Sequence, residues 1–340
     1  MKKLITERKV HTAVAVFFIL GGVAGYLINI AQNAGQEPKI TKITRSNNSY
    51  VFTRPLLAFE VGDKKEFLEY KSMETKLRDL INQNSESGNI QDVSIYFRDL
   101  NNGRWTGVNE NDKFSPGSLL KVPIMIAYYK MAENDPSILS KEITNDNLTE
   151  DYNSDEIIKP DEVIKRGNTY TVDDLIKRMI IYSDNDATVL LFNNIDKRAL
   201  NDVFSDLGIS FNEDPSTEDF ISTKQYSLFF RVLFNSSYLD PVLSEKALSL
   251  LSKADFKNGL RSNLPTDINI SHKFGEREYK YGDNKISTYE FHDCGIVYYT
   301  NNPYILCVMT KGNVNNIKVL ESLAQKISSL IYDEVTNNYK

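Results

Sequence analysis

The sequence predicts an α+β fold in which strands from the two ends of the chain form one antiparallel sheet. Residues 92–98 and 104–108 read as two strands joined by the tight turn Asn101-Asn102-Gly103. Mainly helical patterns follow, and strand patterns return near the end of the chain, over residues 268–274, 289–299 and 304–311. Strands at both ends with helices between them are typical of an antiparallel sheet flanked by helices.

The helical segments follow from apolar periodicity and from residues that cap helices. Apolar side chains recur at helical spacing over 65–82, and Ser85-Glu-Ser-Gly88 ends the pattern. A second helix is predicted over 116–132, and residues 133–168 are polar and irregular. A helix over 171–182 begins with Thr-Val-Asp-Asp, the form of an N-cap. Further helices are predicted over 186–206, 224–234 and 315–335.

The composition excludes several classes of function. The 340-residue chain is 41% hydrophobic and 25% charged, which is typical of a globular protein. Its net charge is −6, and residues 1–9 alone carry +3, so all that follows carries −9. We therefore expect no nucleic-acid partner.

The two cysteines lie close together near the end of the chain. They are too few for a disulfide framework and lack a metal-ligand spacing, so we expect neither a metal nor another cofactor. Cys294 and Cys307 flank a predicted turn over 298–304 and could face each other across two strands. We expect two free thiols rather than a disulfide.

The N-terminal segment predicts a membrane anchor. Residues 10–31 contain no Lys, Arg, Asp or Glu, and about twenty apolar residues are enough to cross a bilayer. The basic residues 1–9 favour a cytoplasmic N-terminus. A cleavable signal peptide is the alternative, but Ala31-Gln-Asn-Ala34 fits a cleavage site poorly. We expect a single-pass protein of the cell membrane, with a linker over 32–65 and a globular domain over 66–335 outside the cytoplasm.

Ser118-Leu-Leu-Lys121 lies at the head of the apolar segment that is predicted to be a helix. Side chains three apart on a helix share a face, so the lysine can accept the proton that activates the serine as a nucleophile. Ser118 would also lie in the first helical turn, where developing negative charge is favoured. The alternative is a surface lysine, because Ser-x-x-Lys alone is a weak pattern.

Two later segments offer groups for the same chemistry. Ser183 could relay a proton and Asn185 could bind a substrate carbonyl, although Ser-Asp-Asn between helices also suits a helix cap. Lys273, at the end of a predicted strand, could hold a substrate carboxylate, and Gly275 would let a ligand approach the backbone. The backbone N–H groups of Ser118 and Glu276 are the candidates for an oxyanion hole.

The order Ser118-x-x-Lys121, Ser183-Asp184-Asn185, Lys273-x-Gly275 resembles the penicillin-recognising serine enzymes, most closely the class A β-lactamases. The similarity covers about residues 90–335 and implies the β-lactamase/transpeptidase-like fold, with an all-helical subdomain beside the sheet. It implies that Ser118 is acylated by a β-lactam or an acyl-D-Ala-D-Ala peptide, with Lys121 as proton acceptor. Ser183 would pass the proton to the departing nitrogen, helped by Lys273, and Asn185 would bind the side-chain amide of the substrate.

The chain departs from the family pattern at two places. Phe274 stands where the family has threonine or serine, so the hydroxyl contact to a substrate carboxylate is lost and Lys273 would carry more of the recognition. The Glu-x-x-Leu-Asn loop motif, whose glutamate activates the deacylating water, has no counterpart. Glu213 and Glu218 are the remaining candidates for this base, and without a positioned base hydrolysis of the acyl-enzyme should be slow.

The expected function is that of a membrane-anchored serine hydrolase that opens β-lactams, which implies a part in antibiotic resistance. One alternative is a peptidoglycan D,D-peptidase that uses the same residues on cell-wall stem peptides. The other is a catalytically impaired homologue that binds cell-wall fragments or a partner protein, which Phe274 would favour. In each case we expect a monomer.

Overall fold

The computed structural model describes ten stretches of the 340-residue chain, which are residues 44–45, 50–58, 70–85, 88–146, 148, 150–154, 156–211, 219–281, 286–313 and 317–338. The predicted membrane anchor over 10–31 lies outside these ranges, as do Glu213 and Glu218. Within them, no helix has both the length and the apolar character needed to cross a membrane.

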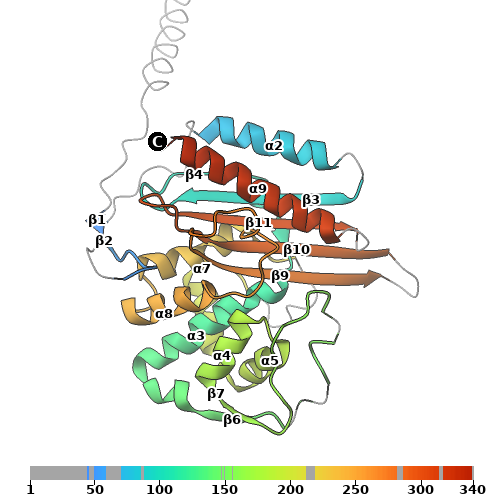
Figure 1. Cartoon of the computed structure of the whole chain (residues 1–340). Helices are drawn as coiled ribbons and strands as arrows, with labels where there is room; N and C mark the ends of the chain where they lie inside the picture. Colours follow the sequence, from blue (N-terminus) through green and yellow to red (C-terminus); the bar gives the residue numbers. More distant parts are fainter. Residues whose placement is uncertain are drawn as a thin grey trace, which may run out of the picture. The chain divides into compact units, whose positions relative to one another are not determined.

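Five strands form the antiparallel sheet that the sequence predicts (Figure 1). The order across the sheet is β4-β3-β11-β10-β9, and all neighbours are antiparallel. Strand β3, from the start of the domain, therefore pairs with β11, the last strand, as expected. The bounds are β3 Ile90–Asp99, β4 Trp105–Val108, β9 Ile270–Tyr281, β10 Ile286–Val297 and β11 Tyr304–Asn313.

Helices cover both faces of this sheet. Figure 1 shows α2 and α9 together on one face, and α7 with α8 on the other. Beyond α7 lies a helical part in which α3 contacts α4, α5, α6 and α8. The helices are α2 Lys71–Ser85, α3 Lys121–Asn134, α4 Val172–Ile181, α5 Asn185–Asn194, α6 Lys197–Asp206, α7 Thr223–Asn235, α8 Pro241–Leu251 and α9 Ile317–Asn338.

Short elements join these layers. Residues 50–58 pack on the domain, where the Glu245 carboxylate accepts hydrogen bonds from the backbone N–H groups of Val51, Phe52 and Thr53. The 3-10 helix η2 precedes α3 directly. The remaining short elements are β1 Thr44–Arg45, β2 Leu56–Ala58, β5 Lys113–Phe114, η2 Gly117–Leu120, η3 Pro136–Ser140, β6 Glu142–Thr144, β7 Thr169–Thr171 and β8 Ile221–Ser222.

Two hydrophobic cores lie on the two faces of the sheet. In β11, Ile305, Cys307 and Met309 belong to the core around α3, whereas Leu306 and Val308 belong to the core beneath α2 and α9. A strand buried on both faces reads as a continuous apolar run rather than an alternating one. Helix α3 likewise has apolar side chains around most of its circumference, as expected of a helix that is buried over most of its length.

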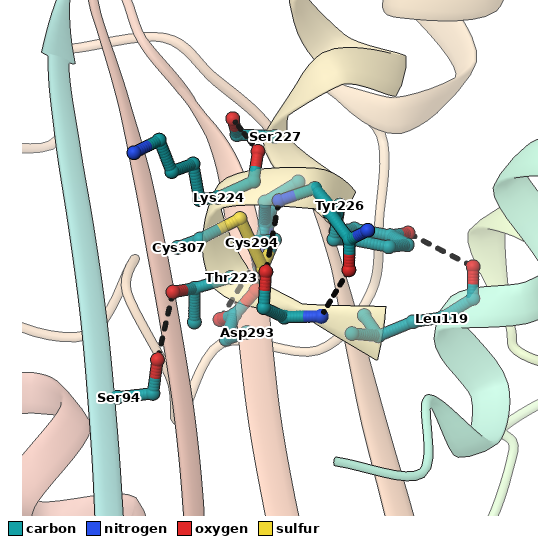
Figure 2. The surroundings of a disulfide bond; sticks show 12 residues. Ser94, Leu119, Thr223, Lys224, Tyr226, Ser227, Asp293, Cys294 and Cys307 are labelled. Atoms are coloured by element: carbon teal, nitrogen blue, oxygen red, sulfur yellow. Dashed lines mark hydrogen bonds and ion pairs between the residues drawn. A yellow bond between two sulfur atoms is a disulfide. The ribbon is translucent and has the colours of Figure 1, made fainter. Parts of the chain in front are cut away.

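The expectation of free thiols is wrong, because Cys294 and Cys307 form a disulfide (Figure 2). The two residues are direct partners in the β10–β11 register, with their Cα atoms 4.1 Å apart. Both side chains are fully buried, and Figure 2 shows the bond beside Thr223 and Tyr226 of α7. The antiparallel register brings the two sulfurs together. The predicted turn over 298–304, which the cysteines flank, had indicated that they could face each other.

Candidate active site

Ser118 lies on η2, a tight turn that packs against strand β9. The predicted helix over 116–132 thus begins as a 3-10 turn, and Lys121 is the first residue of α3. A Cβ atom at Gly275 would lie 2.7 Å from the carbonyl oxygen of Pro116 and 3.0 Å from the backbone nitrogen of Leu119. Gly275 therefore leaves room for the turn that carries Ser118, and its contact with a ligand stays a prediction.

The backbone just before this turn is held at Ser115 by three buried or half-buried side chains. The Ser115 N–H donates to Glu290 Oε2 (3.1 Å), Arg277 Nη1 donates to Ser115 Oγ (2.7 Å), and His292 Nε2 lies 2.9 Å from the Ser115 carbonyl oxygen. Burial acts to raise the pKa of Glu290, but the contacts of His292 and Lys311 lower it below its ordinary value. An ionised Glu290 thus accepts the Ser115 N–H.

Lys121 is 2% exposed and donates hydrogen bonds to the turn between α4 and α5. Its Nζ lies 2.6 Å from the carbonyl oxygen of Ser183, 2.9 Å from Ser183 Oγ and 2.6 Å from Asn185 Oδ1. Burial lowers the pKa of Lys121 to about 8, although nearby carboxylates, above all Glu156, act to raise it. Close to neutral pH, a fraction of this lysine is therefore uncharged and able to accept a proton.

Ser183 is the point at which three polar side chains meet. Its Oγ donates to Ser118 Oγ at 3.4 Å and accepts from the ammonium groups of Lys121 and Lys273, both at 2.9 Å. The residue has a φ of +63°, an uncommon conformation for a residue other than glycine. The cap that the sequence also suggested is present, because Asp184 accepts from the first N–H groups of α5.

Lys273 is 1% exposed, and its ammonium group makes hydrogen bonds inside the protein. Its Nζ donates to Ser183 Oγ and, at 3.0 Å, to the carbonyl oxygen of Phe274. The Phe274 ring lies over the ammonium group at 4.1 Å and stacks on Phe256 at 4.1 Å. Burial, together with the charge of Lys121, lowers the pKa of Lys273 well below its ordinary value.

Asn185 uses all its side-chain hydrogen-bonding groups within the protein. Its Oδ1 accepts from Lys121, and its Nδ2 donates to the carbonyl oxygen of Tyr152 (3.1 Å) and to Glu156 Oε1. Glu156 lies in the irregular segment between β6 and β7 and also hydrogen-bonds the carboxyl of Glu276. Glu156 belongs to no motif, and the sequence analysis missed it.

The Glu276 side chain is 7% exposed and is fixed by several groups. Its Oε1 accepts from the backbone N–H groups of Ile157 (3.1 Å) and Ile158 (2.8 Å), and Tyr289 donates to its Oε2. Burial, followed by the hydrogen bond with Glu156, raises the pKa of Glu276 to about 7. A protonated Glu276 can therefore donate to Glu156 at neutral pH.

Ser118, Lys121, Asn185, Glu156 and Glu276 line one cavity of about 270 Å³. The two glutamates are the only carboxylates among its described lining residues. Away from Ser118 its wall is apolar and includes Ile124, Val189, Phe192, Leu200, Phe204 and Phe211. Across the described ranges, no group of three or more His, Cys, Asp or Glu side chains could hold a metal ion.

The sequence matches a protein-family model over most of its length. The model described as "Beta-lactamase enzyme family" matches residues 72–335, a range that includes all the residues lining the cavity around Ser118. The chain belongs to the β-lactamase enzyme family. It is accordingly a β-lactamase-like serine hydrolase, in agreement with the expectation from the three motifs.

Solved structures with the β-lactamase fold are similar to most of this chain. PBP-A, in a variant described as an acyl-enzyme complex with penicillin G, is 20% identical with a TM-score of 0.63, covering 78% of this chain and 97% of its own. A β-lactamase from Sphaerobacter thermophilus DSM 20745 is 18% identical with a TM-score of 0.62, covering 76% and 95%. One from Chitinophaga pinensis DSM 2588 is 20% identical with a TM-score of 0.63, covering 76% and 99%. None of the curated proteins searched matches the chain.

In this member of the β-lactamase family, the structure brings together six residues that the sequence singled out, namely Ser118, Lys121, Ser183, Asn185, Lys273 and Glu276. It also adds two groups that sequence reasoning missed. Glu156 and Glu290 reach the site through tertiary contacts. The sequence did contain a sign of the role of Glu290, because Glu290 and His292 alternate with apolar residues along β10. Charged side chains in such a strand are seldom buried without a partner.

Proposed function

We propose that Ser118 attacks the carbonyl carbon of a β-lactam and forms an acyl-enzyme. The convergence of Ser118, Lys121 and Lys273 on Ser183 Oγ carries this proposal. The Ser118 proton passes through the Ser183 hydroxyl to a neutral Lys121, because Ser183 lies between the two groups. As the ring C–N bond breaks, the Ser183 hydroxyl protonates the departing nitrogen and regains a proton from Lys121.

The developing oxyanion is bound by the backbone N–H groups of Ser118 and Glu276. This pair is supported by the direct packing of η2 against β9. The two backbones approach so closely that a Cβ at Gly117 would collide with the carbonyl oxygen of Glu276. Two such fixed donors stabilise the charge that forms on the carbonyl oxygen in the transition state. To bind a substrate side chain, the Asn185 amide has to give up one of its two N–H hydrogen bonds within the protein.

Slow hydrolysis of the acyl-enzyme is part of the proposal. Both described carboxylates in the cavity already hold hydrogen bonds, Glu156 from Asn185 and Glu276 from two backbone N–H groups. Of the described residues of α5 and α6 that line the cavity, only Asn185 and Thr188 are polar, and neither side chain is a base for water. Glu213 and Glu218 remain candidates for that base.

These features favour a second candidate function, that of a peptidoglycan D,D-peptidase. Such an enzyme would form the same acyl-enzyme with the D-Ala-D-Ala end of a stem peptide. A persistent β-lactam adduct is expected of it, because a rigid β-lactam product blocks the site when no base activates water. Rapid turnover would instead favour a β-lactamase.

The test follows the mass of the purified full chain after mixing with a chromogenic β-lactam. A mass increase equal to the β-lactam, absent in S118A, is the expected result. A transient adduct with continued colour change favours the β-lactamase, and an adduct that lasts for hours favours the peptidase. Wild type without any adduct would contradict acyl transfer and favour the impaired cell-wall-binding homologue.

We also propose that residues 10–31 anchor the enzyme in the cell membrane with the catalytic domain outside the cytoplasm. The basic residues 1–9 and the uncharged segment support this orientation, and the Cys294–Cys307 disulfide is typical of an oxidising compartment. Protease added to intact spheroplasts should degrade the domain and spare an N-terminal tag. Recovery of a mature protein that lacks residues 1–31 would contradict the anchor.

A further inference from the structure

We propose that Glu156 determines specificity, by occupying the side-chain N–H of Asn185 that an acylamide group of the substrate would otherwise bind. This inference rests on the proposed acylation of Ser118. It predicts that acyl donors with an acylamide substituent must displace Glu156, whereas donors without one need not.

The hydrogen bonds of Asn185 carry the argument. A primary amide has one acceptor oxygen and two N–H donors. Lys121 takes the oxygen at 2.6 Å, the Tyr152 carbonyl takes one N–H at 3.1 Å, and Glu156 takes the other. Of these acceptors for the N–H groups, Glu156 lines the cavity beside Ser118 and Tyr152 does not. The N–H that faces the cavity is therefore the one that Glu156 holds.

The cavity offers a ligand few side-chain amide donors. Asn185 is the single side-chain amide among the described residues that line it. A ligand carbonyl that seeks this donor competes directly with a carboxylate, which is the stronger acceptor. Competition of this kind lowers the reactivity of acylamide-bearing donors relative to all others.

The rest of the site holds Glu156 in place. Its carboxyl is hydrogen-bonded to Glu276 of β9, so Glu156 links α5 to β9 next to the nucleophile. Glu276 is in turn bound by the Ile157 and Ile158 N–H groups and by Tyr289. Among the neighbouring carboxylates, Glu156 acts most strongly to raise the pKa of Lys121. Removing the negative charge of Glu156 would act through Lys121 and would therefore affect all acyl donors alike.

Two substitutions separate the hydrogen bond from the charge. E156A removes both, whereas E156Q removes the charge but retains an amide oxygen that can accept the Asn185 N–H. Each protein is mixed with benzylpenicillin, which carries an acylamide, and with meropenem, which carries a hydroxyethyl group instead. The second-order rate constant of acylation is measured by intact mass after rapid quenching, and the benzylpenicillin-to-meropenem ratio is compared.

We expect E156A to raise this ratio about tenfold, as one charge-assisted hydrogen bond no longer has to be displaced. E156Q, whose neutral amide oxygen is a weaker acceptor than the carboxylate, should raise the ratio by less, about threefold. The matched control is E162A, in the same segment, where Glu162 pairs with Arg178 (3.5 Å) and lies outside the cavity. Its ratio should equal that of wild type.

An unchanged or lower ratio in E156A would overturn the inference, as would an equal rise in E156Q and E156A. Failure of the proposed function looks different, because neither compound would then acylate any of the four proteins. Thermal melting of each variant identifies a loss of folding. A misfolded E156A would lose reactivity toward both compounds together and could not produce the expected rise in ratio.

Discussion

At Lys121, burial and the surrounding carboxylates act in opposite directions on the charge. Burial dominates and lowers the pKa to about 8, which leaves about a tenth of the side chains neutral at pH 7. Three hydrogen bonds fix the ammonium group on Ser183 and Asn185. The lysine is thus held at the serine that connects it to the nucleophile, in a form that can take up a proton.

Acylation should therefore depend on pH through Lys121. The neutral fraction of the lysine rises with pH, so we expect the acylation rate constant for benzylpenicillin to rise about tenfold per unit below pH 8 and to level off above it. Quenched reactions between pH 6 and 9.5 measure this profile. S118A should show no adduct at any pH. A flat profile would mean that another group accepts the proton.

The Glu276 carboxyl should make stability depend on pH. Its pKa is raised from 4.5 to about 7, so between these values the native state keeps a proton that the unfolded chain has lost. The stability that this group contributes is fully present below pH 4.5 and is lost as pH rises through 7.

The melting temperature of wild type should consequently fall between pH 5 and 7.5 relative to that of E276Q, whose amide resembles the neutral acid and does not titrate. Thermal unfolding at half-unit intervals measures the difference. E162Q, at an exposed position, should follow wild type. Parallel curves for wild type and E276Q would show that Glu276 is ionised throughout this range.

At the scale of elements, the site depends on how closely η2 approaches β9. Gly275 leaves room for the carbonyl of Pro116, and the contacts of Glu290, Arg277 and His292 hold Ser115 just before the turn. The nucleophile is thus positioned by backbone packing as well as by its side-chain partners.

G275A should displace this turn. Its Cβ would approach to 2.7 Å of a backbone oxygen that cannot move alone, so we expect a loss of about 1–3 kcal/mol in the free energy of unfolding and acylation at least tenfold slower. Denaturant titration and intact mass measure the two effects. In the control G167A, with a φ of +79° and no atom within 4 Å, backbone strain alone should lower stability while acylation is kept.

The elements with strong local patterns were predictable. The hairpin, the three late strands and the helix that begins at the Thr171 cap lie where the sequence placed them. Helix α8 was missed, although Asp240 followed by Pro241 is a helix start that local chemistry favours. The motifs indicated five of the site residues. The positions of Glu156 and Phe274 could not be predicted in this way because they depend on tertiary folding. Glu156 lies in an irregular loop, and the Phe274 ring lies over the ammonium group of Lys273.

At the scale of the whole molecule, the disulfide joins β10 to β11 at the centre of the sheet. It closes a loop with a sequence separation of 13 residues, for which the chain-entropy account gives about 3 kcal/mol of stabilisation. Both sulfurs are buried in the core around α3, so reductant should reach them only when the chain unfolds.

Alkylation of the denatured chain should reveal the disulfide directly. Without reductant, iodoacetamide should add no mass, and after reduction it should add two groups, because the chain has two cysteines. The reduced and alkylated protein should unfold at a lower denaturant concentration. Two groups added without reduction would restore the expectation of free thiols.

The pairing of β3 with β11 has a consequence for synthesis. These neighbours in the sheet come from near opposite ends of the domain, so their contact has a very large sequence separation. The sheet cannot be complete until the last strand has emerged, and β9, against which η2 rests, also comes late in the chain. Ser118 is translated early, but it becomes reactive only when nearly the whole chain is available, so the enzyme is inactive for as long as it is being made.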